Sequence, residues 1–87
     1  MILTKATGHF TETEIDDEIV VMSLESGDFF SLTGTAKAIW LALDAGLDRH
    51  GLIAHLVGEF GAAPNAIGPD VDTFLEQLRG AGLLASR

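Results

Sequence analysis

A single change of hydrophobic period, near Thr33, divides the sequence into two parts. Before this residue, apolar and polar side chains alternate as they do along β-strands. After it, apolar side chains recur at three- and four-residue spacing, as on one face of a helix. The sequence therefore predicts an α+β fold in which the strands come first and the helices follow.

The first part of the chain predicts an antiparallel meander of three strands. The expected strands are Phe10 to Ile15, Glu18 to Leu24 and Asp28 to Leu32. Asp16-Asp17 forms the first turn, and Glu25-Ser26-Gly27 forms the second, where Gly27 can adopt a positive φ. The second segment is apolar at both alternating positions, so we expect it to be the central strand.

The second part predicts three amphipathic helices. Their apolar stripes are Ala36-Ile39-Trp40-Leu43, Leu52-Ile53-Leu56-Val57-Phe60 and Val71-Phe74-Leu75-Leu78. Thr33 and Asp48 are expected to be N-caps whose side chains accept backbone N–H groups, and Gly46 and Gly61 are expected to follow the helix ends. Strands followed by helices in this order indicate a winged helix-turn-helix-like unit.

The start of the third helix is expected at Pro69, because proline suits the first turn of a helix. Residues 62–68 are then a loop, and Leu83-Leu84 fold back as a short tail. Asp70 and Asp72 would lie near the positive N-terminal end of the helix dipole, which explains both acids without a binding role.

Length and composition limit the class of protein. The chain has 87 residues and no cysteine, which predicts one domain spanning 1–87, with its core at about 10–84 and no disulfide. No apolar run is long enough to span a bilayer and no signal peptide is evident, so we expect a cytoplasmic protein. The lack of an apolar span also argues against a membrane partner. The net charge of −8, with five acids between Glu12 and Glu18, disfavours duplex nucleic acid and would attract a basic peptide, and a solvated loop explains the acidic run equally well.

Residue patterns that support catalysis are missing from the sequence. His50 and His55 are five residues apart, which does not place two ligands on one helical face, and there is no phosphate-binding loop or dinucleotide motif. Asp16-Asp17 supplies too few ligands for a cation and is better explained as a turn. The sequence therefore predicts a non-enzymatic protein without a metal or other cofactor.

Packing into the core does not explain both members of the pair Phe29-Phe30. Consecutive strand residues point to opposite faces, so Phe30 and Leu32 would enter the core while Phe29 and Ser31 point outward. The third strand would also be an edge strand, which can pair with a visiting peptide. The alternatives are that a helix covers Phe29 or that a second copy of the chain covers the edge.

Four segments together resemble the PqqD-like family, whose members are also called RiPP recognition elements. They are LESGDFFSLT at 24–33, TAKAIW at 35–40, DVDTFL at 70–75 and LRGAGLL at 78–84. The resemblance covers Phe10 to Leu84. Two departures are the phenylalanine pair, where tyrosine is commoner, and Thr33, where the family has asparagine.

This resemblance implies a non-catalytic protein that binds the leader region of a ribosomally made precursor peptide. The leader would add to the third strand as a further strand, in a groove beside the third helix. The implied peptide-binding residues are Asp28, Phe29, Phe30, Ser31, Leu32, Val71, Asp72, Leu75, Glu76 and Arg79. Val71 and Leu75 would line an apolar pocket, and Asp72 and Glu76 would meet basic leader residues.

The implied role is delivery of the leader to a leader peptidase or another maturation enzyme. Lasso-peptide biosynthesis is the favoured pathway, and a chaperone in pyrroloquinoline quinone synthesis is the alternative. Two further hypotheses remain open: a homodimeric structural module that pairs through the third strand, and a winged-helix DNA-binding protein. The second requires a basic face, whereas Asp70, Asp72 and Glu76 outnumber Arg79 on the third helix.

Overall fold

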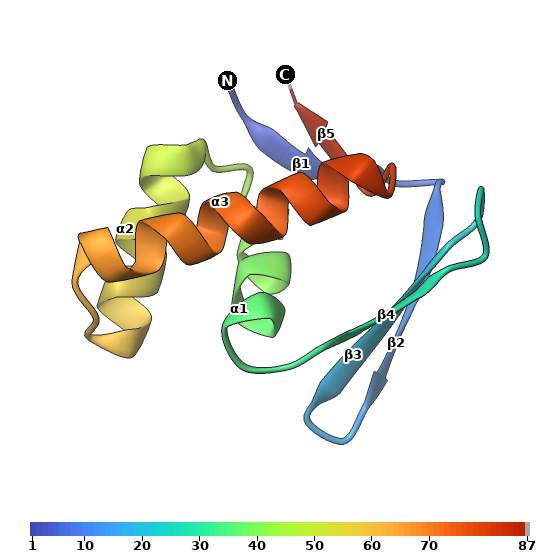
Figure 1. The fold of residues 1–87 in the computed structure, drawn as a ribbon, viewed down its shortest axis with the longest axis horizontal. Coiled ribbons are helices and arrows are strands. Elements are labelled where there is room, and N and C mark those ends of the chain that lie inside the picture. Colours follow the sequence, from blue (N-terminus) through green and yellow to red (C-terminus); the bar gives the residue numbers. More distant parts are fainter. Residues whose placement is uncertain (87) are drawn as a thin grey trace.

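The computed structural model describes residues 1–86 as an α+β fold with helices on one side of a three-stranded sheet (Figure 1). Its strands are β1 (Leu3–Lys5), β2 (Phe10–Ile15), β3 (Glu18–Ser23), β4 (Phe29–Leu32) and β5 (Leu84–Ser86). Its helices are α1 (Gly34–Ala42), the 3-10 turn η1 (Leu43–Ala45), α2 (Arg49–Phe60) and α3 (Pro64–Gly80). The predicted order of strands and helices is confirmed.

The predicted meander is present as an antiparallel sheet in the order β2-β3-β4. The β2–β3 hairpin closes at Asp16-Asp17, where Ile15 is opposite Glu18 and Asp16 takes a φ of 55° that aspartate tolerates well. β3 is central, as expected. Ile19 and Val21 are buried against the helices, and the intervening Val20 and Met22 are half-buried on the outward face.

Of the two predicted helix N-caps, one makes its capping hydrogen bond and the other does not. Asp48 caps α2 as predicted, since its Oδ1 accepts the backbone N–H of Gly51 at 2.7 Å. Thr33 occupies the N-cap position of α1, but its side chain makes no capping hydrogen bond. The expected hydroxyl cap is wrong because Gly34 follows with a φ of +56°, which turns the first helical amides away from the capping geometry.

The predicted start of α3 is also wrong. The helix begins at Pro64, so most of the expected loop at 62–68 is helical and Pro69 lies inside the helix. Pro64 fits the first helical position because no N–H is needed there. Pro69 removes one backbone bond, and burial of Ile67 and Val71 on either side offsets that loss. Asp70 and Asp72 therefore lie beyond the first turn, and the helix dipole does not explain them.

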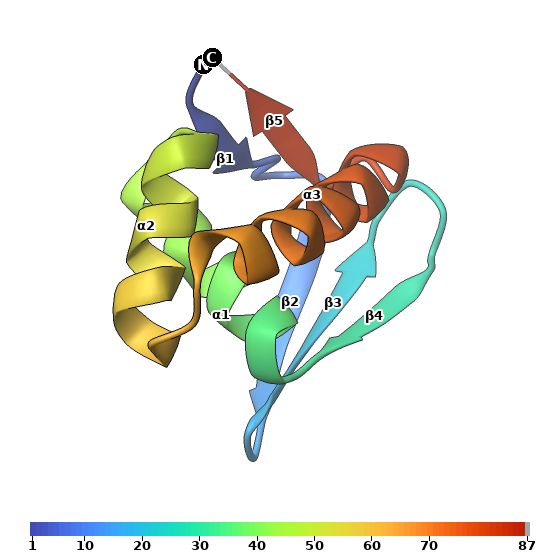
Figure 2. The same cartoon turned by 60° about the vertical axis from the view of Figure 1, so that its left-hand side comes forward.

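A second sheet joins the two ends of the chain and was not predicted. β1 and β5 pair antiparallel, with Leu3 opposite Ser86 and Lys5 opposite Leu84. The two termini consequently lie side by side (Figures 1 and 2). Leu3 and Leu83 are both buried in the main core, so the core also includes a residue outside the expected 10–84 range.

Trp40 lies at the centre of the core, as its place in the apolar stripe predicts, with none of its surface exposed. Phe10 meets the indole edge to face with ring centroids 5.1 Å apart, and Lys5 Nζ lies 4.5 Å from the indole centroid. The indole N–H donates to Glu12 Oε2 at 2.9 Å. Lys5 is also bonded to Asp44 Oδ2 at 3.0 Å. This Trp40 cluster therefore links β1, β2, α1 and η1.

Among residues 1–86, no helix combines the length and the apolar character that a membrane crossing requires.

The burial pattern generates a stability prediction with two matched leucines. Leu56 of α2 is completely buried, whereas Leu41 of α1 is 46% exposed. Leu56→Ala should lower the free energy of unfolding by about 2–5 kcal/mol because it leaves a cavity. Leu41→Ala should cost less than about 1 kcal/mol. Chemical denaturation of both variants checks this, and equal losses would contradict the described core.

Candidate functional site

The free edge of β4 presents a defined set of backbone groups. Ser23 N–H donates to the Asp28 carbonyl at 2.9 Å, and the same register places Phe30 opposite Val21 and Leu32 opposite Ile19. Hydrogen-bonded pairs alternate along an antiparallel ladder. The C=O group of Asp28 and the N–H and C=O groups of Phe30 and Leu32 therefore face β3, and those of Phe29 and Ser31 face the free edge.

The turn before β4 fixes where this edge begins. Gly27 has a φ of 76° and donates its N–H to the Ser23 carbonyl at 2.8 Å. Ser23 is buried, and its hydroxyl accepts the N–H of Ser26 at 3.3 Å. Asp28 is exposed, and its N–H is held by the Ser26 hydroxyl. The turn is therefore closed by its own hydrogen bonds, which keeps β4 in register.

The β4 side chains point as the alternation predicts. Leu32 is buried, Phe30 packs against the core, and Phe29 and Ser31 are exposed on the outward face. Phe29 is 70% exposed, and no helix covers it. Its cross-strand neighbour is Met22, and the Ser31 hydroxyl donates to Glu18 of β3.

α3 has two flanks, and they face different parts of the molecule. In Figure 2, α2 lies on one side of α3 and β4 on the other, and in Figure 1 α2 passes behind the first half of α3. On the side of α1, which follows β4 directly, Asp70, Thr73, Phe74 and Gln77 line a hollow of about 270 Å³ together with Thr35, Ala36 and Ile39. On the other side, Asp72, Leu75, Glu76 and Arg79 line a hollow of about 220 Å³ with Met1, Leu3 and Arg49.

The five predicted helix residues differ in burial and in the flank on which they lie. Val71 has no exposed surface and Leu75 is buried, so both belong to the core. Asp72, Glu76 and Arg79 are exposed, but they line the hollow on the side away from β4. The structure therefore brings Asp28 to Leu32 together on one strand and does not bring the five predicted helix residues to it. Thr73 and Gln77, which were not among the predicted residues, lie on the flank beside α1.

Asp72 is held by an ion pair that sequence separation concealed. Arg49 Nε donates to Asp72 Oδ1 at 2.6 Å, and Arg49 Nη2 donates to Oδ2 at 2.9 Å, across 23 positions. The hydrogen bonds from Arg49, followed by its charge, hold the pKa of the Asp72 carboxyl below its ordinary value, and the pKa of Arg49 is raised in turn. Glu76 is bonded to Arg79 one turn later.

The histidines lie apart from one another. His9 Nδ1 is 3.0 Å from Glu25 Oε1, and His55 Nε2 is 3.5 Å from Glu59 Oε2. Within the described part of the chain, no three His, Cys, Asp or Glu side chains gather as metal ligands would. The arrangement offers backbone pairing at β4 and apolar and polar contacts from α3, which is the chemistry of a peptide-binding site.

The comparisons with known proteins agree with this fold. The sequence model of the PqqD family, described as Coenzyme PQQ synthesis protein D, matches residues 18–84. The chain therefore belongs to the PqqD family, as the resemblance of its motifs predicted. No curated protein matches its sequence.

Two solved structures share the fold over nearly their whole length. "TbiB1 in Complex with the TbiA(beta) Leader Peptide" is 25% identical, with a TM-score of 0.82 over 93% of this chain and 94% of that one. "Lasso peptide synthetase B1 complexed with the leader peptide" is 18% identical, with a TM-score of 0.80 over 97% and 98% of the two chains.

The Arg49–Asp72 pair predicts a pH effect with a definite sign. Because the pKa of Asp72 is lowered in the folded state, the pair stabilises the protein above the ordinary carboxyl pKa of 3.8. That contribution is lost as the pH falls through the lowered pKa. Arg49→Gln should return the pKa of Asp72 toward 3.8, as NMR titration of its carboxyl carbon can measure. Arg79→Gln is the control and should leave Asp72 unchanged; an Asp72 that titrates alike in all three proteins would refute the assignment.

Proposed function

We propose that this protein recognises the leader of a ribosomally synthesised precursor peptide and binds it as an additional strand on β4. The observation that carries the proposal is the open edge at Phe29 and Ser31, whose N–H and C=O groups face away from β3. Two proteins of the same fold are known as leader-peptide complexes, which supports the same role here. Binding by this route needs no catalytic group.

The backbone ladder and the neighbouring pockets have different roles in the proposed complex. Main-chain bonds to Phe29 and Ser31 supply affinity with little demand on the leader sequence, and alternate leader side chains supply specificity. One set points outward beside Phe29. The other points toward the helices, where the hollow lined by Thr73, Phe74 and Gln77 receives apolar or uncharged leader residues.

We further propose that the domain delivers the leader rather than modifying it. A disordered leader loses conformational freedom on binding, which keeps the affinity moderate and the exchange fast. Holding the leader raises the effective concentration of the attached core peptide near a leader peptidase or another maturation enzyme. We favour lasso-peptide biosynthesis, and a chaperone in pyrroloquinoline quinone synthesis is the alternative that the family description supports.

The surface charge of α3 argues against DNA binding, and the position of the free edge bears on the homodimer hypothesis. α3 carries Asp70, Asp72 and Glu76 on its exposed surface, and both of its arginines within reach, Arg49 and Arg79, are already paired with acids. A winged-helix-like arrangement therefore does not bring a DNA-binding face with it. Self-pairing through β4 uses the same edge as the leader, so a leader that binds must dissociate such a dimer.

A proline substitution at the free edge tests strand addition. Ser31→Pro removes an N–H that faces away from β3, so the sheet keeps its own bonds while the leader loses one donor. Leader affinity should fall about three- to tenfold. The peptide is the leader encoded by the neighbouring short reading frame, and calorimetric titration measures its binding.

Glu14→Pro is the matched control, because Leu24 N–H donates to the His9 carbonyl and this register turns the N–H of Glu14 toward the free edge of β2. That variant should bind the leader normally. Unchanged affinity of a folded Ser31→Pro protein would rule out addition at β4.

Adjacent residues on the two flanks of α3 test which flank contacts the leader. Gln77→Trp places a large ring in the hollow beside α1 and should weaken leader binding about tenfold or more. Glu76→Trp places the same ring on the flank that faces α2 and should have little effect. Fluorescence anisotropy of a labelled leader measures both, and the reverse ranking would restore the helix residues expected from sequence.

A further inference from the structure

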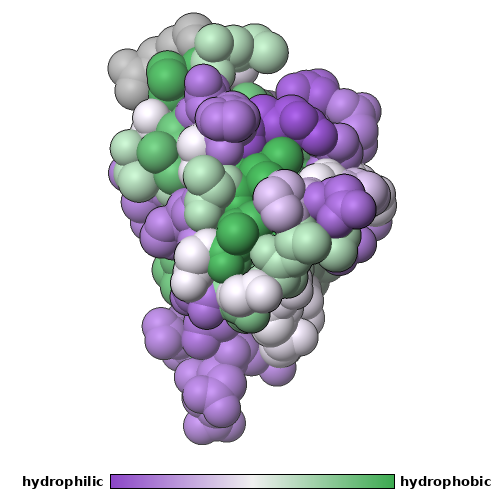
Figure 3. Space-filling model, turned by 90° about the vertical axis from the view of Figure 1, so that its left-hand side faces the viewer, coloured by the Kyte–Doolittle hydropathy of each residue, from purple (hydrophilic) through white to green (hydrophobic). Residues whose placement is uncertain are grey.

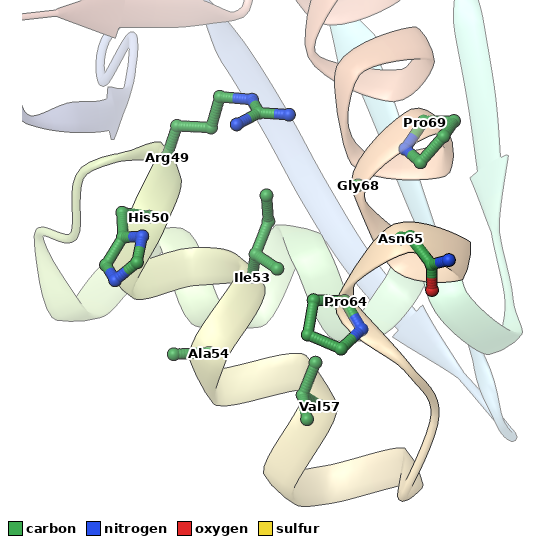
Figure 4. Close-up of a pocket in the computed structure, with 9 residues that line it drawn as sticks. All are labelled: Arg49, His50, Ile53, Ala54, Val57, Pro64, Asn65, Gly68 and Pro69. Atoms are coloured by element: carbon green, nitrogen blue, oxygen red, sulfur yellow. The ribbon is translucent and has the colours of Figure 1, made fainter.

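The acids that the sequence analysis placed against the leader are already paired within the protein. Asp72 is bonded to Arg49, and Glu76 is bonded to Arg79. Arg49 also borders a hollow of about 650 Å³ between α2 and the first half of α3, whose walls are mostly apolar (Figure 4). Figure 3 views this side of the molecule, where apolar side chains form a band. A charge that selects the leader must therefore lie elsewhere, closer to β4.

Glu18 of β3 holds a carboxylate beside β4. The register pairs Ser31 with Val20, so Glu18 is the diagonal neighbour of Ser31 on the outward face of the sheet. The Ser31 hydroxyl donates to Oε1 of Glu18, which holds the carboxylate toward the last strand. Oε2 accepts no hydrogen bond from residues 1–86. One carboxylate oxygen is therefore available close to the free edge.

Within the described residues, no cation pairs with this carboxylate. Lys37 of α1 reaches the same hairpin, but it donates to the main-chain carbonyl of Asp17 and forms no ion pair with Glu18. Glu18 is half-buried, so its charge is screened less than that of a fully exposed acid. Asp16 and Asp17 of the adjoining turn add to the negative potential, and the hairpin forms the hydrophilic projection at the foot of Figure 3. The outward face at this end of β4 therefore attracts a cation.

Phe29 gives the other end of β4 an apolar character. Its ring is 70% exposed, and its cross-strand partner is the half-buried Met22. The next residue in this row is Thr11 of β2, so the row contains no charged side chain. It ends at the free edge in an exposed aromatic ring, which favours an apolar or aromatic neighbour on the next strand.

A leader strand on β4 would meet both features with the same face. Its residues opposite Phe29 and Ser31 are two positions apart, and residues two apart along a strand share a face. Both would point outward, because directly opposite residues of paired strands lie on the same side of the sheet. The leader residue between them would point toward the helices.

We propose that the leader carries a lysine or arginine opposite Ser31 and an apolar residue opposite Phe29, two positions apart on its outward face. The cation meets Oε2 of Glu18, and the apolar side chain covers the Phe29 ring. This inference rests on the proposed leader binding and names the side-chain chemistry that β4 selects. Main-chain pairing then fixes the strand, and these two contacts fix which leader residues lie on it.

Neutralisation of Glu18 without a change of shape tests the charge. Glu18→Gln keeps an oxygen for the Ser31 hydroxyl, so leader affinity should fall about two- to fivefold at low salt, and by less at about 1 M salt. The probe is the leader encoded by the neighbouring short reading frame, titrated calorimetrically into the full chain. Glu14→Gln is the matched control, because it removes the same charge from the other face of the hairpin, and it should bind normally. Equal losses in the two variants, or no loss in Glu18→Gln, would overturn the proposal.

Double-mutant cycles locate the two leader residues. Each leader Lys or Arg is changed to Gln in turn, and one change should cost about two- to fivefold in the unmodified chain and nothing further in Glu18→Gln. A leader residue two positions away should couple in the same way with Phe29→Ala. Asp70→Asn tests the other acid near the expected path, since Asp70 lines the hollow beside α1. Coupling of the cation to Asp70 in place of Glu18, or a spacing other than two, contradicts the assignment.

The Ser31→Pro variant separates this inference from strand addition itself. If Ser31→Pro weakens leader binding and Glu18→Gln does not, strand addition stands and the side-chain recognition is wrong. If the leader binds both variants as tightly as the unmodified chain, or does not bind the unmodified chain, both proposals are overturned. Losses in both variants, with normal binding of Glu14→Gln, support both.

Discussion

The packing around Trp40 is the interaction on which the rest of the structure depends. The indole is completely buried, with Phe10 against its edge, Lys5 against its face and Glu12 on its N–H. A buried ammonium is costly unless it is paired, and Lys5 has Asp44 and Glu12 as carboxylate partners besides the ring. This cluster anchors the otherwise exposed β2 to the helices, and with β2 it sets the position of the whole meander.

A sheet held on one face leaves its other face and its last strand open. β4 leads directly into α1, so the strand that carries the free backbone groups is fixed at both ends, by the Ser23–Gly27 turn and by the helix. α3 then divides the neighbouring surface into two flanks, one beside α1 and the other beside α2. A rigid edge strand with a helix alongside suits recognition of an extended peptide, and the second flank is left for other contacts.

The sequence predicted those features that depend on neighbouring residues, namely the hairpin at Asp16-Asp17, the central position of β3, the core and outward faces of β4, and the Asp48 cap. β1 and β5 escaped prediction because each has three residues and pairs across almost the full chain. Pro64 and Pro69 both suit the first turn of a helix. Tertiary packing, and not the local sequence, makes Pro64 the start of α3. Helical spacing shows that Glu76 and Gln77 are both exposed on α3. It does not show which of them lies on the side nearer β4, because that depends on the tertiary position of β4.

Amide hydrogen exchange with and without the leader tests the central claim most directly. In the free protein, the amides of Phe29 and Ser31 face the open edge and should exchange quickly, while those of Phe30 and Leu32 are protected by β3. The account predicts that bound leader protects Phe29 and Ser31 and leaves Phe30 and Leu32 protected as before. A leader that binds without protecting Phe29 and Ser31, or that protects Phe10, Glu12 and Glu14 on the β2 edge instead, would contradict strand addition at β4.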